Sequence, residues 1–117
     1  MDKKKTIIVD LDGCVLKHYG IGATKQWRTF NPLPNVLEAF DAWERDGHCI
    51  VLMSARKECC RFDLEVELRT LGLFWDHLIL GVPSGERVLI NDRKPDVGPS
   101  CRAICVSRNV GLNGGNL

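Results

Sequence analysis

The sequence predicts one α/β domain, residues 1–117, with a mostly parallel sheet flanked by helices. Short apolar runs typical of buried strands alternate with segments of helical periodicity, the order expected when crossover helices join parallel strands. A chain of 117 residues, 44% of them hydrophobic, has room for one domain with a single core.

Five segments have the composition of strands. They lie near residues 5–11, 48–53, 77–80, 87–91 and 102–106. Residues 81–86 are too few for a parallel crossover, which takes about a dozen residues. The segment 77–80 is therefore expected to run antiparallel at an edge of the sheet, or to be barely a strand.

Two amphipathic helices are predicted between these strands. The first begins at Pro34 and Asn35 and ends at Gly47, with these apolar residues on one side: Val36, Leu37, Phe40 and Trp43. The second covers about 57–71 and ends before Gly72, with these residues at helical spacing: Cys60, Leu64, Leu68 and Leu71. Each helix therefore has one face suited to packing on the sheet.

Two carboxylates, Asp10 and Asp12, lie where the first apolar run ends and Gly13 begins a turn. In a strand, residues i and i+2 point to the same face, so these like charges crowd each other. A divalent cation such as Mg²⁺ is the usual remedy. The same triplet also fits a solvated acidic turn, because Asp and Gly are common in loops.

Polar residues also follow two later apolar runs. Ser54, Ala55 and Arg56 follow the run 49–53, and Asp92 and Asp96 follow the run 87–90. In parallel α/β sheets, ligands bind in the crevice outside the carboxyl ends of the strands. We therefore expect these residues to converge with Asp10 and Asp12 on one site.

This order of motifs resembles the haloacid dehalogenase superfamily, most of whose members are Mg²⁺-dependent phosphatases with a Rossmann-like fold. Asp10-Leu11-Asp12-Gly13 resembles the first signature of the family, with Cys14 in place of the usual Thr. Ser54 occupies the place of the second signature, and Asp92 and Asp96 resemble the paired acids of the fourth.

The resemblance implies a role for each acid. Asp10 would attack phosphorus and form an aspartyl-phosphate, and Asp12 would exchange protons with the leaving oxygen and with water. Mg²⁺ would be held by the Asp10 carboxylate, the Asp12 backbone carbonyl and the Asp92 carboxylate. Asp96 would act in the second shell or through water.

The phosphate would be held by the Ser54 hydroxyl, the backbone N–H groups of Ala55 and Arg56, and the Arg56 guanidinium. The family's third-signature lysine is missing, because Val82 fills its place. Arg87 is one candidate for the positive partner, but a strand of five residues would put it roughly 16 Å from Asp92. Lys94, two residues past Asp92, is the preferred candidate.

Larger relatives carry a cap domain, and no segment here is long enough for one. Residues 13–33 would form a loop or flap with aromatic and basic residues suited to gripping a leaving group or to packing on the core: His18, Tyr19, Trp27, Arg28 and Phe30. Residues 107–117 would form a flexible tail. The open site would take a large or end-on substrate, or a neighbouring subunit of a homo-oligomer would close it.

Three functions remain open. They are a phosphatase of a small phosphorylated metabolite such as a phosphosugar, a catalytically weak phosphate-binding or regulatory domain, and a phosphatase acting on a macromolecular end. A net charge of +1 gives no electrostatic footprint for nucleic acid. No membrane span or signal peptide is recognised, so the expected location is the cytoplasm, without a membrane partner.

Six cysteines occur without a CxxC pair, which argues against a disulfide or zinc framework. Cys49 and Cys105 fall in apolar runs and are expected to behave as core residues. Cys14, beside the expected nucleophile, is the thiol expected to make the protein sensitive to oxidation or alkylation.

Overall fold

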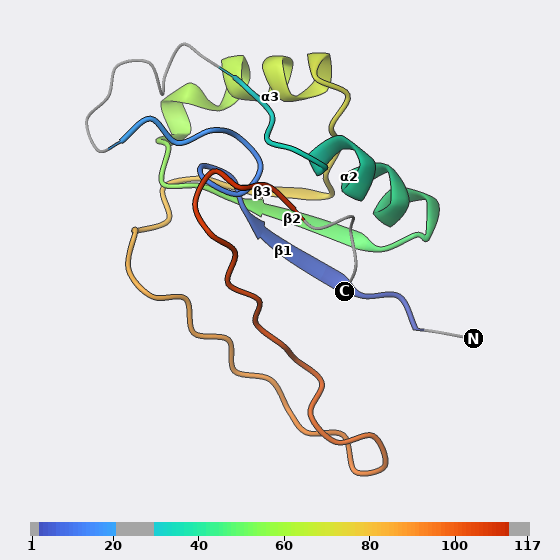
Figure 1. Cartoon of the computed structure of the whole chain (residues 1–117). Helices are drawn as coiled ribbons and strands as arrows, with labels where there is room; N and C mark the ends of the chain where they lie inside the picture. Colours follow the sequence, from blue (N-terminus) through green and yellow to red (C-terminus); the bar gives the residue numbers. More distant parts are fainter. Residues whose placement is uncertain (1–2, 21–29, 113–117) are drawn as a thin grey trace.

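The computed structural model describes residues 3–20 and 30–112, and a three-stranded parallel sheet forms its centre (Figure 1). The strands β1 (Thr6–Asp10), β2 (Cys49–Met53) and β3 (His77–Ile79) lie in the order β1-β2-β3. At the carboxyl edge Asp10 lies opposite Met53, and Met53 lies opposite Ile79. The predicted parallel α/β class is confirmed.

Two helices cover one face of this sheet. α2 (Val36–Arg45) joins β1 to β2, and the 3₁₀ turn η1 (Glu58–Cys60) with α3 (Arg61–Thr70) joins β2 to β3. Both crossovers step in the same direction along the sheet, and since such connections are right-handed, both helices lie on the same side (Figure 1). Among the described residues, none of the helices has the length and apolar character needed to cross a membrane.

The core lies between this helical layer and the sheet. The most deeply buried side chains come from the helices, the inner face of the sheet and the turn after β1, and they include Phe40, Leu52, Leu64, Leu68, Leu11, Val15 and Leu16. Ile7 and Val9 of β1 belong to this core, whereas Ile8 between them is 47% exposed. The face of the sheet away from the helices is therefore open at Ile8.

Three of the five predicted strands differ from the structure. β3 lies at the edge of the sheet and has three residues, as expected, but it runs parallel to β2 rather than antiparallel, because η1 and α3 supply a full crossover before it. The segments 87–91 and 102–106 form no strands in the described structure. The short link 81–86, which the sequence showed to be inadequate for a parallel crossover, does not return to the sheet but leads away from it.

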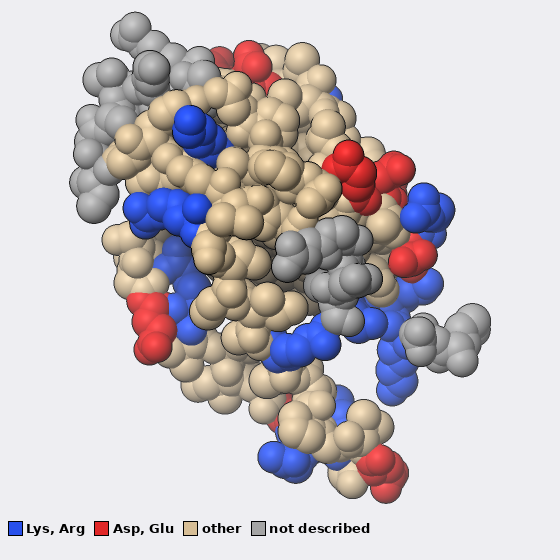
Figure 2. Space-filling view, in the orientation of Figure 1, with Lys and Arg blue, Asp and Glu red and all other residues tan. Residues whose placement is uncertain are grey.

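Residues 83–107 form a projection that we call the arm. Its first limb runs out to a tip at residues 93–98, and its second limb runs back to the body (Figure 1). At the tip, the N–H of Lys94 donates to the carbonyl of Gly98, and the N–H of Gly98 donates to that of Lys94. The arm protrudes from the body in the space-filling view, with charges of both signs on it (Figure 2). Cys105 lies on it and is exposed, so the prediction of a core position for this cysteine was wrong.

Candidate active site

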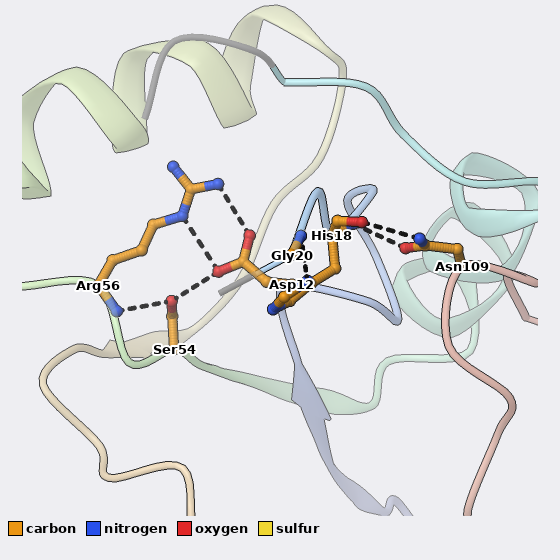
Figure 3. A network of polar contacts seen from close by, with 6 residues as sticks. All are labelled: Asp12, His18, Gly20, Ser54, Arg56 and Asn109. Carbon is orange, nitrogen blue, oxygen red and sulfur yellow. Dashed lines mark hydrogen bonds and ion pairs between the residues drawn. The ribbon is translucent and has the colours of Figure 1, made fainter. Parts of the chain in front are cut away.

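A network of polar side chains joins the turn after β1 to the end of β2 (Figure 3). The Arg56 guanidinium donates to both oxygens of Asp12, from Nη2 at 2.8 Å and from Nε at 3.1 Å. The Ser54 hydroxyl donates to Asp12 Oδ2 at 3.1 Å. Ser54 and Arg56 are the two buried polar residues in the core of the described chain, with 1% and 4% of their surface exposed. The predicted convergence of Asp12, Ser54 and Arg56 is therefore present.

Backbone hydrogen bonds fix these residues at the carboxyl edge of the sheet. The N–H of Leu11 donates to the carbonyl of Met53 and continues the β1–β2 ladder by one residue. On the other side, Val82 donates to the carbonyl of Ser54, and Gly81 donates to that of Arg56. The loop 54–56 is thus held between the turn after β1 and the segment that leaves β3.

The backbone N–H groups of Ala55 and Arg56, which were expected to bind phosphate, do not both face the site. The N–H of Arg56 donates to Ser54 Oγ at 3.0 Å, so this group orients the hydroxyl instead of facing an open site. Ala55 is exposed, and η1 begins at Glu58 rather than directly after Ser54. The groups that face Asp12 are the Ser54 hydroxyl and the Arg56 guanidinium.

Asp10 differs from Asp12 in its surroundings. It shares a strand face with the exposed Ile8, away from the helices. Burial raises the pKa of Asp10 above its ordinary value, and the Asp12 charge adds to this, whereas the positive charge of Arg87 lowers it. The two carboxylates therefore differ in their electrostatic surroundings. Asp12 forms an ion pair with Arg56, whereas the charge of Arg87 offsets only part of the effect of burial on Asp10.

Of the two candidates for the missing lysine, Arg87 and not Lys94 lowers the pKa of Asp10, and His18 acts in the same direction. Lys94 Nζ contacts both carboxylate oxygens of Asp92 at 2.8 and 3.0 Å, and all of these groups are exposed on the arm. The guanidinium of Arg87 is held by the carbonyls of Pro83 and Gly85 at the base of the arm. The structure therefore does not bring Lys94 to the site, because the run 87–90 leads away from the sheet.

The predicted magnesium ligands are not assembled within one chain. Asp92 and Asp96 lie exposed near the tip of the arm. In residues 3–20 and 30–112, no three acidic, histidine or cysteine side chains are grouped to hold a metal ion. Among the described residues, Asp10 and Asp12 are the predicted ligands that lie at the carboxyl edge of the sheet, and Asp92 lies outside it on the arm.

The flap that follows Asp12 is tied to a residue that the sequence did not single out. The Asn109 side chain accepts from the N–H of His18 at 2.7 Å and donates to the His18 carbonyl at 2.8 Å (Figure 3). The N–H of Asn109 also donates to the carbonyl of Gly13 at 2.9 Å. The first part of the predicted tail is thus anchored beside the site. Asn109 has a left-handed backbone (φ 62°), which Asn adopts more readily than most residues. Because it lies in a segment rich in Gly and Asn, the sequence did not distinguish it as a residue that anchors the flap.

Of the aromatic residues predicted in the flap, Phe30 lies under Arg56. The Arg56 guanidinium carbon lies 5.3 Å from the centre of the Phe30 ring, a cation–π contact. Phe30 also packs against the core. Tyr19 is linked to Asn31 by a hydrogen bond, and Trp27 and Arg28 lie outside the described residues. Phe30 therefore supports the Arg56 side chain from below.

Cys14 lies next to this site as a half-buried thiol. Burial raises its pKa to about 11, and the charges of Asp10 and Cys105 act in the same direction. A thiol with this pKa stays protonated at neutral pH, which lowers its reactivity. The structure therefore speaks against Cys14 as the most reactive cysteine.

The chain matches no family profile and no curated protein sequence. It is similar to two solved structures. One is a structural-genomics target from Vibrio cholerae, with 20% identity over 77% of this chain and 81% of that chain and a TM-score of 0.52. The other is the D,D-heptose 1,7-bisphosphate phosphatase of B. bronchiseptica, complexed with magnesium and phosphate. It has 22% identity over 84% of this chain and 55% of that chain, with a TM-score of 0.51.

These similarities define the class of protein by its fold. The heptose bisphosphate phosphatase is a member of the haloacid dehalogenase superfamily. The parallel sheet β1-β2-β3 and the helices that cover it match the fold of both structures. This chain has a haloacid dehalogenase-like, Rossmann-type fold, as its motifs predicted.

Proposed function

We propose that this protein is a Mg²⁺-dependent phosphatase that hydrolyses phosphate monoesters of a small metabolite. The observation that carries the proposal is the contact of Ser54 and Arg56 with Asp12, beside the less compensated Asp10. A buried guanidinium and hydroxyl that hold a carboxylate have the donors needed to hold phosphoryl oxygens. A carboxylate nucleophile and a second carboxyl group for proton transfer are the remaining requirements.

Each step of the proposed reaction balances with these residues. A carboxylate oxygen of Asp10 attacks phosphorus, and the bond from phosphorus to the ester oxygen breaks. Asp12, which the substrate phosphoryl group displaces from Arg56 and which takes up a proton from solvent, gives this proton to the leaving oxygen. Water then attacks the phosphorus of the aspartyl-phosphate, Asp12 takes a proton from it, and inorganic phosphate leaves with Asp10 restored. Ser54 and Arg56 hold the phosphoryl oxygens throughout.

Arg87 is the proposed replacement for the missing lysine. Its charge acts on Asp10, and a cation beside the nucleophile offsets repulsion between the carboxylate and the phosphate. Magnesium is proposed as cofactor because the similar phosphatase of B. bronchiseptica was crystallised with magnesium and phosphate. A sugar phosphate is the proposed substrate class, since that enzyme acts on a heptose bisphosphate.

A second candidate is a phosphate-binding or regulatory domain with weak activity. The exposed position of Asp92 favours it, since one chain then lacks the third metal ligand. This candidate predicts that phosphate binds at Ser54 and Arg56 without turnover.

The deciding experiment is hydrolysis of an aryl phosphate with and without Mg²⁺, followed by a panel of sugar phosphates. Asp10→Asn is compared with Asp41→Asn, which changes an exposed acid on α2. We expect Mg²⁺-dependent turnover that Asp10→Asn lowers by at least about 100-fold and Asp41→Asn leaves unchanged. Phosphate binding without turnover of any panel member would favour the second candidate.

A further inference from the structure

The arm exposes an apolar surface that the body of the described chain does not cover. Its first limb carries Val88, Leu89 and Ile90, whose exposed fractions are 75%, 59% and 90%. Val97 at the tip and Ile104 on the second limb are exposed as well. Exposed apolar surface of this extent marks an interaction site more often than a free surface.

The same chain also leaves one edge and one face of its sheet open. Within residues 3–20 and 30–112, β1 pairs with β2 in the sheet, and none of the described strands lies on its other edge. Ile8 of β1 and Ile79 of β3 are about half exposed on the face without helices. Parallel sheets are normally covered on both faces, and no helix of the described part of the chain covers this side.

The arm cannot pair with β1 of its own chain in a way that brings Asp92 to Asp10. For Asp92 to reach the Asp10 of its own chain, the run 87–91 would have to lie parallel to β1. The chain would then have to return from the carboxyl edge, where β3 ends, to the amino edge within residues 81–86. A parallel crossover needs about a dozen residues.

The direction of the arm instead fits the β1 of a second copy. Gly81 and Val82 are hydrogen-bonded at the carboxyl edge, and the Arg87 guanidinium is held by the carbonyls of Pro83 and Gly85 directly after them. From there the first limb runs opposite to β1 (Figure 1). Five residues at about 3.3 Å each carry Asp92 roughly 16 Å from Arg87, which is about the length of β1.

We propose that two copies of this chain form a two-fold symmetric dimer in which each first limb pairs with β1 of the other copy. In such a dimer the two β1 strands run in opposite directions, so a limb that runs opposite to its own β1 is parallel to the partner's β1. Each site then receives Asp92 of the partner subunit while it keeps its own Arg87. The two sheets become one continuous sheet across the two-fold axis.

The size and charge of the arm suit this role. An interface of standard size uses roughly 20–30 residues from each side, which is about the length of the segment 83–107. The arm carries both signs of charge, with Arg87, Arg93, Lys94 and Arg102 beside Glu86, Asp92 and Asp96. A two-fold interface brings the same surface together from both copies, and mixed charge allows it to be self-complementary.

The first test is the mass of the protein in solution by light scattering. We expect twice the chain mass of 13.1 kDa. Ile90→Asp places a charge in the paired limb and is expected to give a monomer, whereas Phe62→Asp is the matched control. Phe62 is 78% exposed on α3, away from the limb, and its variant should remain a dimer. A monomeric wild type, or a dimer that Ile90→Asp leaves intact, overturns the proposal.

The second test is subunit complementation, which also depends on the proposed phosphatase activity. Chains carrying Asp10→Asn and Asp92→Asn are co-expressed with different tags, and the mixed dimer is purified through both. One site of the mixed dimer then contains an intact Asp10 and an intact partner Asp92. We expect about half of the wild-type activity per dimer, whereas each variant alone is inactive.

The outcomes separate the two proposals. If the wild type is active but the mixed dimer is as inactive as either variant, each chain uses its own Asp92. This result would overturn the proposal that the partner supplies Asp92. A wild-type dimer that Ile90→Asp dissociates, but without turnover of any phosphate ester, supports the arm interface and contradicts the phosphatase. An active monomer supports the phosphatase and contradicts the dimer.

Discussion

Arg56 and Asp12 form a two-point contact, in which Nη2 donates to Oδ1 at 2.8 Å and Nε donates to Oδ2 at 3.1 Å. A phosphoryl group offers a pair of oxygens with the same geometry to a guanidinium. Under the proposed function, the Asp12 carboxylate therefore lies where a substrate phosphoryl group would bind. Binding of the substrate would release Asp12 from Arg56 and free it for proton transfer.

Replacement of Arg56 is expected to affect both stability and substrate binding. Arg56→Met leaves the Asp12 carboxylate without its charged donor, and we expect a loss of ~1–3 kcal/mol in the free energy of unfolding. The KM for a phosphate ester should rise by about tenfold or more. Urea unfolding and steady-state kinetics measure the two effects.

Arg69→Met is the matched control for this prediction. Arg69 forms an exposed pair with Glu65 at 3.6 Å and a contact with the Trp75 ring, so its loss should cost less than ~1 kcal/mol and leave KM unchanged. Equal effects of the two variants would show that the Arg56–Asp12 contact has no special role.

The raised pKa of Asp10 predicts a pH-dependent gain in stability for Asp10→Asn. The folded chain binds the Asp10 proton more tightly than the unfolded chain does. Its contribution to stability is full below the ordinary pKa of about 4 and is lost as the pH rises through the folded pKa. Without Mg²⁺, Asp10→Asn should therefore be more stable than wild type at pH 7, by a margin that shrinks toward pH 4.

Urea unfolding at the two pH values tests this expectation, with Asp41→Asn as the exposed control. Addition of Mg²⁺ should stabilise the wild type and leave Asp10→Asn unaffected, if Asp10 binds the ion. A variant that is less stable than wild type at both pH values would contradict the assigned burial of a charged Asp10.

Arg87 is expected to influence the pH at which kcat/KM falls on the acid side of the pH profile. Its charge lowers the pKa of Asp10, so Arg87→Gln should raise that pKa and move the acid limb of kcat/KM to higher pH. Arg45→Gln, which removes an arginine from the last turn of α2, should leave the acid side of the pH profile unchanged. A uniform loss of activity at all pH values, without a shift of the limb, would mean that Arg87 does not act through Asp10.

Part of this site could be predicted from sequence and part could not. Asp12 and Ser54 could be paired because parallel strands in register bring their carboxyl ends together, whatever the details of packing. The run Arg87–Ile90 has the composition of a buried strand, but whether a strand pairs depends on the length of the connection that precedes it. Distance along the chain favoured Lys94 over Arg87, and the turn at Pro83 and Gly85 reversed that order in space.

The pKa of Cys14 predicts slow alkylation. With a pKa of about 11, its reactive thiolate is scarce at pH 7.5. We expect iodoacetamide to modify it at least about tenfold more slowly than the exposed Cys59, as measured by peptide mass mapping over time. Faster labelling of Cys14 than of Cys59 would restore the sequence-based expectation of a sensitive thiol beside the nucleophile.

Gly111 is expected to tolerate no side chain. Its φ is 95°, and a Cβ there would lie 2.2 Å from the carbonyl oxygen of Pro34. Gly111→Ala should therefore lower the free energy of unfolding by well over ~1 kcal/mol. Gly72→Ala has a similar φ of 88° without a nearby atom, so it isolates the backbone strain. Equal losses would show that the close contact with Pro34 adds nothing.

The hydrogen bond from Asn109 to Gly13 has a consequence for the timing of folding during synthesis. The strands and helices up to β3 can pair while the chain is still growing, because their contacts are complete by residue 79. The turn that carries Asp12 gains its last support only when residue 109 has left the ribosome, roughly 1.5–6 s after β3 at about 5–20 residues per second. Nascent chains would therefore contain the finished sheet before they contain the finished site.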